Sequence, residues 1–338
     1  RFVARPPTFR PDLEREIDIV EEVARRIGLD SIPRTLPPAT RSGTGLSPRQ
    51  RDRRTVVDAL VGAGLAEAVT ISLVSSEAVR AAGYAGGVVE AANPLRAEES
   101  VLRPLVGPGL LQAAARNAAH GLPDLALFEA GHVFRPPTPA TEPLPDERDH
   151  VAVVVAGTRR RAPVEPDRPV DVYDAVDCLR VVTDALGLAD VRLEPEGAPG
   201  FHSGRTAAVV VDGAVAGHVG EYAAATLAAF EMTGPAVGFE LDLDALLAGA
   251  RRDRSFRPLS RFPASAIDLA FVLDDAVAAA AIVGALTEVA GDLAEDVRCF
   301  DEFRSDALGP GRRSLAFALR LRAADRTLTD AEVGDVRA

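Results

Sequence analysis

The sequence is poor in the residues that most often identify a chemical site. Its 338 residues include two cysteines, five histidines and no lysine. Cys178 and Cys299 stand alone, without a second cysteine at the spacing of a metal or redox motif, which indicates two ordinary thiols in a reducing compartment. The histidines form no HxH or HxxxH pair, so we interpret all five as structural or surface residues.

Long hydrophobic runs are also missing. No apolar run reaches the length needed to span a membrane, and the first residues lack the layout of a signal peptide. We therefore expect a soluble, cytoplasmic protein without a membrane partner. A chain of 338 residues is long enough to bury substantial cores and suggests two or three domains.

The charge is negative overall and unevenly spread. The net charge is −12, which argues against a protein that coats nucleic acid. Every basic side chain is an arginine, a composition typical of a GC-rich genome, so arginine enrichment alone is poor evidence of RNA binding. The segment from Arg251 to Ala338 has 13 arginines and 15 acidic residues, so a polyanion would meet the least repulsion there.

The middle of the chain alternates between helical and strand patterns. Ser47 and Pro48 are typical of the start of a helix, and Gly62 to Gly64 end it. A loop then leads into a long helix within Asn93–Gly121, and Asp212-Gly213 is the expected turn of a hairpin. These elements predict an α+β domain with a largely antiparallel sheet. The other expected elements are strands at Glu67–Ser75, Asp124–Phe134 and His150–Gly157, a helix at Val172–Leu188, and a strand running into a helix within Ala236–Ala248.

The last part of the chain follows the order β-α-β-β-α. Ile267, Leu269, Phe271 and Leu273 alternate as in a strand, and a helix is expected over Ala278–Ala290. Two strands follow, and Thr329 with Glu332 forms a capping box for a last helix. This order is one strand short of a ferredoxin-like unit. The helix is expected to turn Ile282, Val283, Leu286 and Val289 inward, and the strand Arg312–Arg322 to turn Leu315, Phe317, Leu319 and Leu321 inward.

An acidic cluster stands out near the start of the chain. Asp18, Glu21 and Glu22 share one face of a helix whose opposite face carries Ile17, Val20, Ala24 and Ile27, and Asp12 lies just upstream. Their mutual repulsion can be relieved by nearby arginines, such as Arg25 and Arg26, or by a hard divalent cation. Spacing alone favours a solvated helix face paired with arginine.

Four stretches of the sequence resemble the bacterial phenylalanyl-tRNA synthetase beta subunit, in that family's order. They are RPDLEREIDIVEEVARRIGLDSIP from Arg10, the stretch Asn93–Phe134, the stretches Phe201–Tyr222 and Ala236–Leu243, and the stretch from Arg261 to Val333. The resemblance implies that residues 1–40 are the end of a metal-carrying domain. It implies a catalytically silent, class II synthetase-like module with an antiparallel sheet at 45–250. It further implies a ferredoxin-like anticodon-binding domain at 256–338, truncated before its last strand, so that the chain is a fragment of a beta subunit.

The same resemblance implies a function. The chain would be the non-catalytic beta subunit of phenylalanine–tRNA ligase, in a tetramer of two alpha and two beta chains. It would support ATP-dependent charging of tRNA(Phe) on the alpha subunit. The resemblance makes Mg²⁺ binding by Asp12, Asp18, Glu21 and Glu22, together with the alpha subunit, the favoured interpretation of the acidic cluster. No residue of this chain is expected to be catalytic, and Glu129 and Glu240 are interpreted as structural.

Two other functions stay open. One is a free-standing synthetase-like paralogue that binds RNA or a protein without any ligase activity. The other, a metal-dependent hydrolase built on the four acids, lacks an accompanying nucleophile. For RNA contact, we expect Arg298, Phe300, Glu302 and Arg304 to share an exposed face beside the strand that carries Arg320 and Arg322, although a buried Phe300 among solvated arginines fits the pattern equally well. The full set of candidates for tRNA contact is Arg298, Phe300, Arg304, Arg312, Arg313, Arg320 and Arg322.

Overall fold

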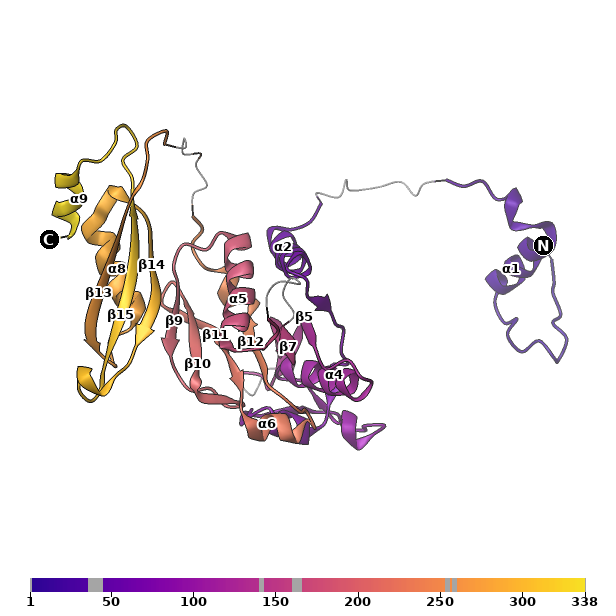
Figure 1. The fold of residues 1–338 in the computed structure, drawn as a ribbon. Coiled ribbons are helices and arrows are strands. Elements are labelled where there is room, and N and C mark those ends of the chain that lie inside the picture. The colour runs from indigo at the N-terminus through magenta and orange to yellow at the C-terminus, as the bar shows by residue number, and fades with distance from the viewer. Residues whose placement is uncertain are drawn as a thin grey trace. The chain divides into compact units, whose positions relative to one another are not determined.

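The structure is a computed structural model that describes residues 2–35, 45–139, 143–159, 166–252, 256 and 260–337. The chain divides into two compact units, Arg1–Arg252 and Asp253–Ala338, and Figure 1 shows their helices and strands in chain order. Within the described ranges, none of the helices combines the length and the apolar character that crossing a lipid bilayer requires.

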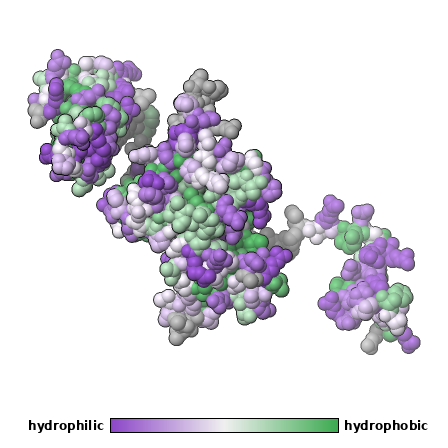
Figure 2. Space-filling model, turned by 60° about the horizontal axis from the view of Figure 1, so that its bottom comes forward, coloured by the Kyte–Doolittle hydropathy of each residue, from purple (hydrophilic) through white to green (hydrophobic). Residues whose placement is uncertain are grey.

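The N-terminal segment contains one helix, α1 (Glu16–Ile27), followed by the short 3-10 helix η1 (Leu29–Ser31). The predicted apolar stripe is present on α1, but its largest side chains, Ile17, Val20 and Ile27, are all more than half exposed. Figure 2 accordingly shows hydrophobic and hydrophilic residues side by side on the surface of this segment. No residue of α1 belongs to a core, so packing does not hold this helix in place.

The central body is built on a seven-stranded sheet with the order β1-β5-β6-β12-β11-β10-β9. Only the short pair β1–β5 is parallel, which confirms the predicted antiparallel character. Asp212 and Gly213 both have positive φ and form the predicted hairpin turn between β10 and β11. The strands are β1 (Ala66–Glu67), β5 (Leu125–Arg135), β6 (Asp146–Ala156), β9 (Val191–Pro195), β10 (Phe201–Val211), β11 (Ala214–Tyr222) and β12 (Ala236–Asp242).

Helices cover both faces of this sheet, and each face has its own core. The helices α2 (Pro48–Gly62), α5 (Val172–Leu186) and α7 (Leu243–Leu247) pack on one face around Phe128 and Phe239. The helix α4 (Gly107–Ala119), with α3 (Ser76–Ala81) and α6 (Ala224–Ala229), covers part of the other face (Figure 1). As predicted, Ser47 caps α2: its hydroxyl accepts a hydrogen bond from the backbone N–H of Gln50.

The prediction of a single strand at Glu67–Ser75 is wrong. Glu67 ends β1, and the chain leaves the ladder at Thr70, whose backbone N–H donates to the buried carboxylate of Glu129 instead of to a strand. The chain then joins a separate small sheet of order β2-β4-β3. Its strands are β2 (Leu73–Val74), β3 (Val89–Glu90) and β4 (Val101–Leu102), and a further pair joins β7 (Thr158–Arg159) to β8 (Arg168–Pro169).

The C-terminal unit has the predicted order of elements. It contains β13 (Ser265–Asp274), α8 (Ala279–Ala290), β14 (Ala294–Phe303), β15 (Arg312–Leu321) and α9 (Asp330–Arg337). The sheet order is β13-β15-β14, with both pairs antiparallel, as a ferredoxin-like βαββα unit requires.

The core of this unit lies between the sheet and α8. Leu315, Phe317, Leu319 and Leu321 are all buried, as the alternation predicted. The expectation for Val289 is wrong, because its side chain is 68% exposed and Ala290 is buried in its place. Ile282, Leu286 and Ala290 are spaced by four residues, so all three lie on the face of α8 that packs against the core. Position 289 lies off that face.

Candidate functional site

The acidic residues of the N-terminal segment are paired with arginines. The Nη2 atom of Arg10 lies 2.7 Å from Oδ2 of Asp12 and 2.6 Å from Oε1 of Glu22. The hydrogen bonds from this guanidinium hold the pKa of both carboxyls below their usual range. Arg25 also contacts Glu22, with Nη2 at 3.1 Å from Oε2. Asp12 and Glu22 therefore share a cationic partner in Arg10.

Asp18 and Glu21 lie in different surroundings. Asp18 also has a cationic partner, since Nη2 of Arg15 lies 3.0 Å from its Oδ1. Asp18 accepts hydrogen bonds at the start of α1 from the backbone N–H groups of Arg15 and Glu14, at 2.7 and 3.0 Å, and these bonds lower its pKa. Glu21 is exposed on the helix. In the part of the chain that the structure describes, no group of three or more His, Cys, Asp or Glu side chains could hold a metal ion. A cation between Asp12 and Glu22 would have to displace Arg10 from both carboxylates.

Within the described residues of the C-terminal unit, one face of the sheet has no helix packed against it. Residues of β15 that alternate with the buried leucines lie on this open face, with Ser314, Ala316 and Ala318 along its middle. The register places Arg298 opposite Ala318 and Phe303 opposite Ser314 on the β14 side. The same register places two carboxylates on this face, Asp301 opposite Ala316 and Asp268 opposite Ala318. The face therefore combines small side chains with one guanidinium, one aromatic ring and two acids.

The prediction that Arg298, Phe300, Glu302 and Arg304 share one face is wrong. The β14–β15 register shifts between Cys299 and Asp301, so Phe300 is the extra residue of a β-bulge. Beyond the bulge the alternation reverses, and Glu302 lies opposite the buried Leu315. Phe303, which is 57% exposed, takes the place on the open face that the pattern gave to Glu302. No local signal in the sequence marks this bulge.

The predicted arginines differ in their partners. Arg298 forms no hydrogen bond or ion pair with any residue that the structure describes, so its guanidinium is available. Each of the other five contacts an acidic side chain of this unit. Arg304 contacts Glu302 and Asp275, Arg312 contacts Asp274, Arg313 contacts Glu302, and Arg320 and Arg322 contact Glu295. An open face with a free arginine and an exposed aromatic ring can bind a phosphate and stack a base.

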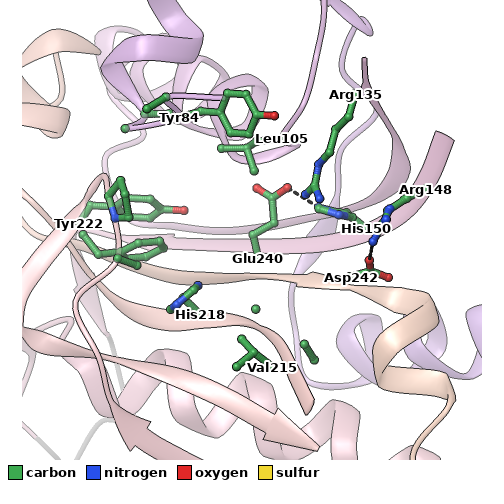
Figure 3. Close-up of a pocket in the computed structure, with 18 residues that line it drawn as sticks. Tyr84, Leu105, Arg135, Arg148, His150, Val215, His218, Tyr222, Glu240 and Asp242 are labelled. Carbon is green, nitrogen blue, oxygen red and sulfur yellow. Dashed lines mark hydrogen bonds and ion pairs between the residues drawn. The ribbon is translucent and has the colours of Figure 1, made fainter. Parts of the chain in front are cut away.

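The central body contains a pocket of about 400 Å³ on the face of the sheet that carries α4 (Figure 3). Its walls come from β5, β6, β10, β11 and β12, with Tyr84 and Leu105 facing them from the α3–α4 region. Glu240 stands in the middle of the view, between His150 and Arg135 on one side and Tyr222 on the other.

Glu240 has a structural role in this pocket. Its two carboxylate oxygens accept hydrogen bonds from the backbone N–H groups of Val106 and Gly107, at 2.8 and 2.9 Å, and so cap the start of α4. The Nδ1 atom of His150 lies 2.8 Å from Oε1 of Glu240. Since an ionised carboxylate only accepts hydrogen bonds, this nitrogen carries the proton.

Most of the remaining charged side chains described in and near this pocket are engaged with one another. An activating site for ATP needs arginines free to bind phosphates and carboxylates free to bind Mg²⁺. In the pocket, Arg148 contacts Asp146 and Asp242, with distances of 3.0 and 3.1 Å. Glu129 lies in the core, paired with Arg103. Of the two pocket arginines, only Arg135 has no acidic partner among the described residues.

Three family models match successive parts of this chain. The model of the tRNA synthetase B5 domain matches residues 1–29. The model of the phenylalanyl tRNA synthetase beta chain CLM domain matches residues 32–243, and that of the ferredoxin-fold anticodon binding domain matches residues 260–338.

Curated proteins named phenylalanine–tRNA ligase beta subunit are similar to nearly the whole of this chain. The phenylalanine–tRNA ligase beta subunit of Cutibacterium acnes is 40% identical, over 98% of this chain and 42% of its own length. Those of Leifsonia xyli and Streptomyces avermitilis are both 39% identical, over 98% of this chain and 42% and 43% of their own lengths. The chain thus spans about two fifths of the length of these relatives. A solved pyrrolysyl-tRNA synthetase from Desulfitobacterium hafniense aligns at 17% identity with a TM-score of 0.48, over 68% of this chain and 73% of that one, which is too distant to bear on function.

Proposed function

The chain belongs to the phenylalanyl-tRNA synthetase beta chain family, and from this premise we propose that it works as a non-catalytic part of phenylalanine–tRNA ligase. The observation that carries this proposal is the order of the three family matches, which together run from residue 1 to residue 338 with short gaps. The activity that this part supports is the ATP-dependent charging of tRNA(Phe) on an alpha subunit. It takes place in the cytoplasm, in an assembly of two alpha and two beta chains.

The central body acts as a scaffold in this proposal. Its carboxylates serve the fold, since Glu240 caps α4 and Glu129 pairs with Arg103 inside the core. A buried ion pair and a capped helix hold the sheet and its covering helices in one arrangement. A rigid body of this kind can present surface to the catalytic subunit without taking part in the chemistry.

The C-terminal unit contributes to tRNA binding in this proposal. The open face of its sheet offers Arg298 for a backbone phosphate and Phe303 for stacking on a base. The five paired arginines are weaker contributors, since a phosphate must compete with the carboxylate that each of them already contacts.

Mg²⁺ remains part of the proposal through Asp12, Asp18, Glu21 and Glu22. Carboxylates are the oxygen ligands that Mg²⁺ prefers, usually together with several waters. In this chain the cation competes with Arg10 for Asp12 and Glu22. Additional ligands from the alpha subunit are therefore needed to favour Mg²⁺ over Arg10. The Mg²⁺ site is therefore proposed only for the assembled enzyme.

Co-purification tests the proposed function. The 338-residue chain is co-expressed with an affinity-tagged phenylalanyl-tRNA synthetase alpha subunit from the same genome, and a tagged seryl-tRNA synthetase serves as the class II control. We expect the chain to elute with the alpha subunit and not with the control. Retention of tRNA by the chain, without any association with the alpha subunit, would instead support the free-standing paralogue.

A further inference from the structure

The pocket in Figure 3 gathers three buried nitrogen atoms that lack a hydrogen bond among the described residues, although the carboxylate of Glu196 lies 3.8 Å from one of them, Nε2 of His218. Nε of Arg135, Nε2 of His150 and Nε2 of His218 are all buried without a hydrogen bond to any residue that the structure describes, and all three residues line the pocket. They come from three strands, β5, β6 and β11, so no single local contact brings them together. Buried polar groups are nearly always satisfied in folded proteins, and such a concentration points to a ligand.

His150 is the best-defined of the three. Its side chain is 4% exposed, and its Nδ1 proton is fixed by the hydrogen bond to Glu240. The other ring nitrogen, Nε2, is therefore left to the pocket. With the proton on Nδ1, Nε2 is a hydrogen-bond acceptor, which an O–H group of a ligand beside Arg135 can satisfy.

Arg135 supplies a positive charge that no acidic side chain in the described part of the chain contacts. The other charged groups of the pocket are engaged with each other or with the backbone: Arg148 with Asp242, and Glu240 with the start of α4. In Figure 3 the guanidinium of Arg135 reaches down towards Glu240 and His150. A partly buried guanidinium without an acidic partner favours a carboxylate or phosphate group, which it can bind in bidentate fashion.

The opposite wall is aromatic. The rings of Phe201 and Tyr222 are stacked, with centroids 4.7 Å apart and an angle of 18° between their planes, and Tyr84 faces the same space. Burial, assisted by the charge of Glu240, raises the pKa of Tyr222 well above its usual range, so its hydroxyl stays protonated as a donor. Flat aromatic walls favour a planar, largely apolar group.

We propose that this pocket binds a small organic anion, with its carboxylate or phosphate group on Arg135 beside His150 and its planar apolar group against Tyr84 and Tyr222. A volume of about 400 Å³ is within the range of small-molecule sites. The ligand stabilises the central body by binding only its folded state. No bond is made or broken in this site.

Three small probes of nearly equal shape test the proposal. Benzoate carries a carboxylate, phenyl phosphate carries a phosphate, and benzamide is the neutral counterpart of benzoate. Calorimetry on the 338-residue chain should show at least one anion binding about tenfold or more tightly than benzamide and raising the melting temperature. The tighter of the two anions identifies the head group. Equal binding of all three probes, or no saturable binding of either anion at millimolar concentration, would overturn the proposal.

Variants of Arg135 separate this site from adventitious binding. Arg135→Gln should abolish the preference for the anions, and Arg135→Lys, which keeps the charge, should retain part of it. Arg192→Gln on β9 is the matched control, because Arg192 is an exposed arginine of the same sheet outside the pocket. Melting temperatures without ligand establish that each variant is folded. Anion binding unchanged in Arg135→Gln would contradict the proposal.

Discussion

Arg103 and Glu129 form an ion pair inside the central body, with Nη1 of Arg103 2.8 Å from Oε1 of Glu129 and both side chains 4% exposed. Thr70 completes the arrangement: its hydroxyl donates to Oε2 of Glu129 at 2.7 Å and lies 2.9 Å from Nη1 of Arg103. Gly131 leaves room beside the pair, because a Cβ at this position would force the guanidinium of Arg103 to shift. This carboxylate joins β5 to the Thr70 loop and to Arg103, which follows β4.

Removing one partner of this pair should be costly. We expect Glu129→Ala to lower the free energy of unfolding by about 3–5 kcal/mol, because it leaves the buried charge of Arg103 uncompensated. Urea unfolding of the chain measures the change. Glu194→Ala, at an exposed position of β9, should change it by no more than about 0.5 kcal/mol. A loss below about 1 kcal/mol for Glu129→Ala would show that the pair contributes little.

The open face of the C-terminal sheet predicts which arginine substitutions weaken tRNA binding most. Arg298→Gln should weaken binding of a tRNA(Phe) transcript and lower the slope of log K against log salt by about one, because one phosphate contact is lost. Phe303→Ala should weaken binding by about 1–3 kcal/mol with little change in that slope, since stacking carries no charge. Filter binding at several salt concentrations measures both quantities.

Arg304→Gln is the control for this prediction, because Arg304 already contacts Glu302 and Asp275. We expect a smaller effect from it than from Arg298→Gln. If the three variants bind tRNA as the wild type does, this face does not contact the RNA.

Arg10 should act as a competitor of Mg²⁺ at the N-terminal segment. It contacts Asp12 and Glu22 from one guanidinium, so Arg10→Gln frees two carboxylates for a cation. We expect calorimetry on the chain assembled with the alpha subunit to show tighter Mg²⁺ binding by this variant than by the wild type. Adding Glu22→Gln to Arg10→Gln should remove the gain, and equal affinity in all three proteins would argue against a cation between these acids.

The stability of the last helix, α9, should depend on pH through the ionisation of Glu332. The backbone N–H of Thr329, then Arg326 and the Thr329 hydroxyl, lower the pKa of Glu332 from its usual 4.5 to about 2. A lowered pKa stabilises the folded state above pH 4.5, and this stabilisation is lost as the pH falls from about 4.5 to about 2. Glu332→Gln should therefore reduce hydrogen-exchange protection in α9 at neutral pH, and the difference from the wild type should close near pH 2.

Asp335→Asn provides the comparison within the same helix, since Asp335 is exposed and is not part of the capping box. It should not reproduce the effect of Glu332→Gln. A wild-type protection that stays constant from pH 7 to pH 2 would mean that the ionised capping box does not hold α9.

Local patterns predicted the elements of this fold well because their causes are local. Ser47 caps α2, and the alternating leucines of β15 face α8, since hydrogen bonds at helix starts and side-chain alternation operate within a few residues. The bulge at Phe300 escaped prediction because one extra residue leaves the composition of a strand unchanged while reversing its faces.

The buried ion pair and the pocket of the central body were not predicted, for a different reason. Arg103 contacts Glu129 only after the strands of the sheet have paired. The same pairing brings Arg135, His150 and His218 into one pocket. In the sequence, Arg103 lies in a predicted loop, and His150 and His218 are isolated histidines. Their partners depend on sheet order and register, which no local pattern encodes.

Phenylalanine-dependent exchange of pyrophosphate into ATP tests most directly the claim that this chain carries no catalytic site. It is measured on the 338-residue chain alone, on the alpha subunit from the same genome alone, and on the two together. We predict no exchange by this chain alone, with any activity of the mixture requiring the alpha subunit. Phenylalanine-dependent exchange by the purified chain without an alpha subunit would contradict the account.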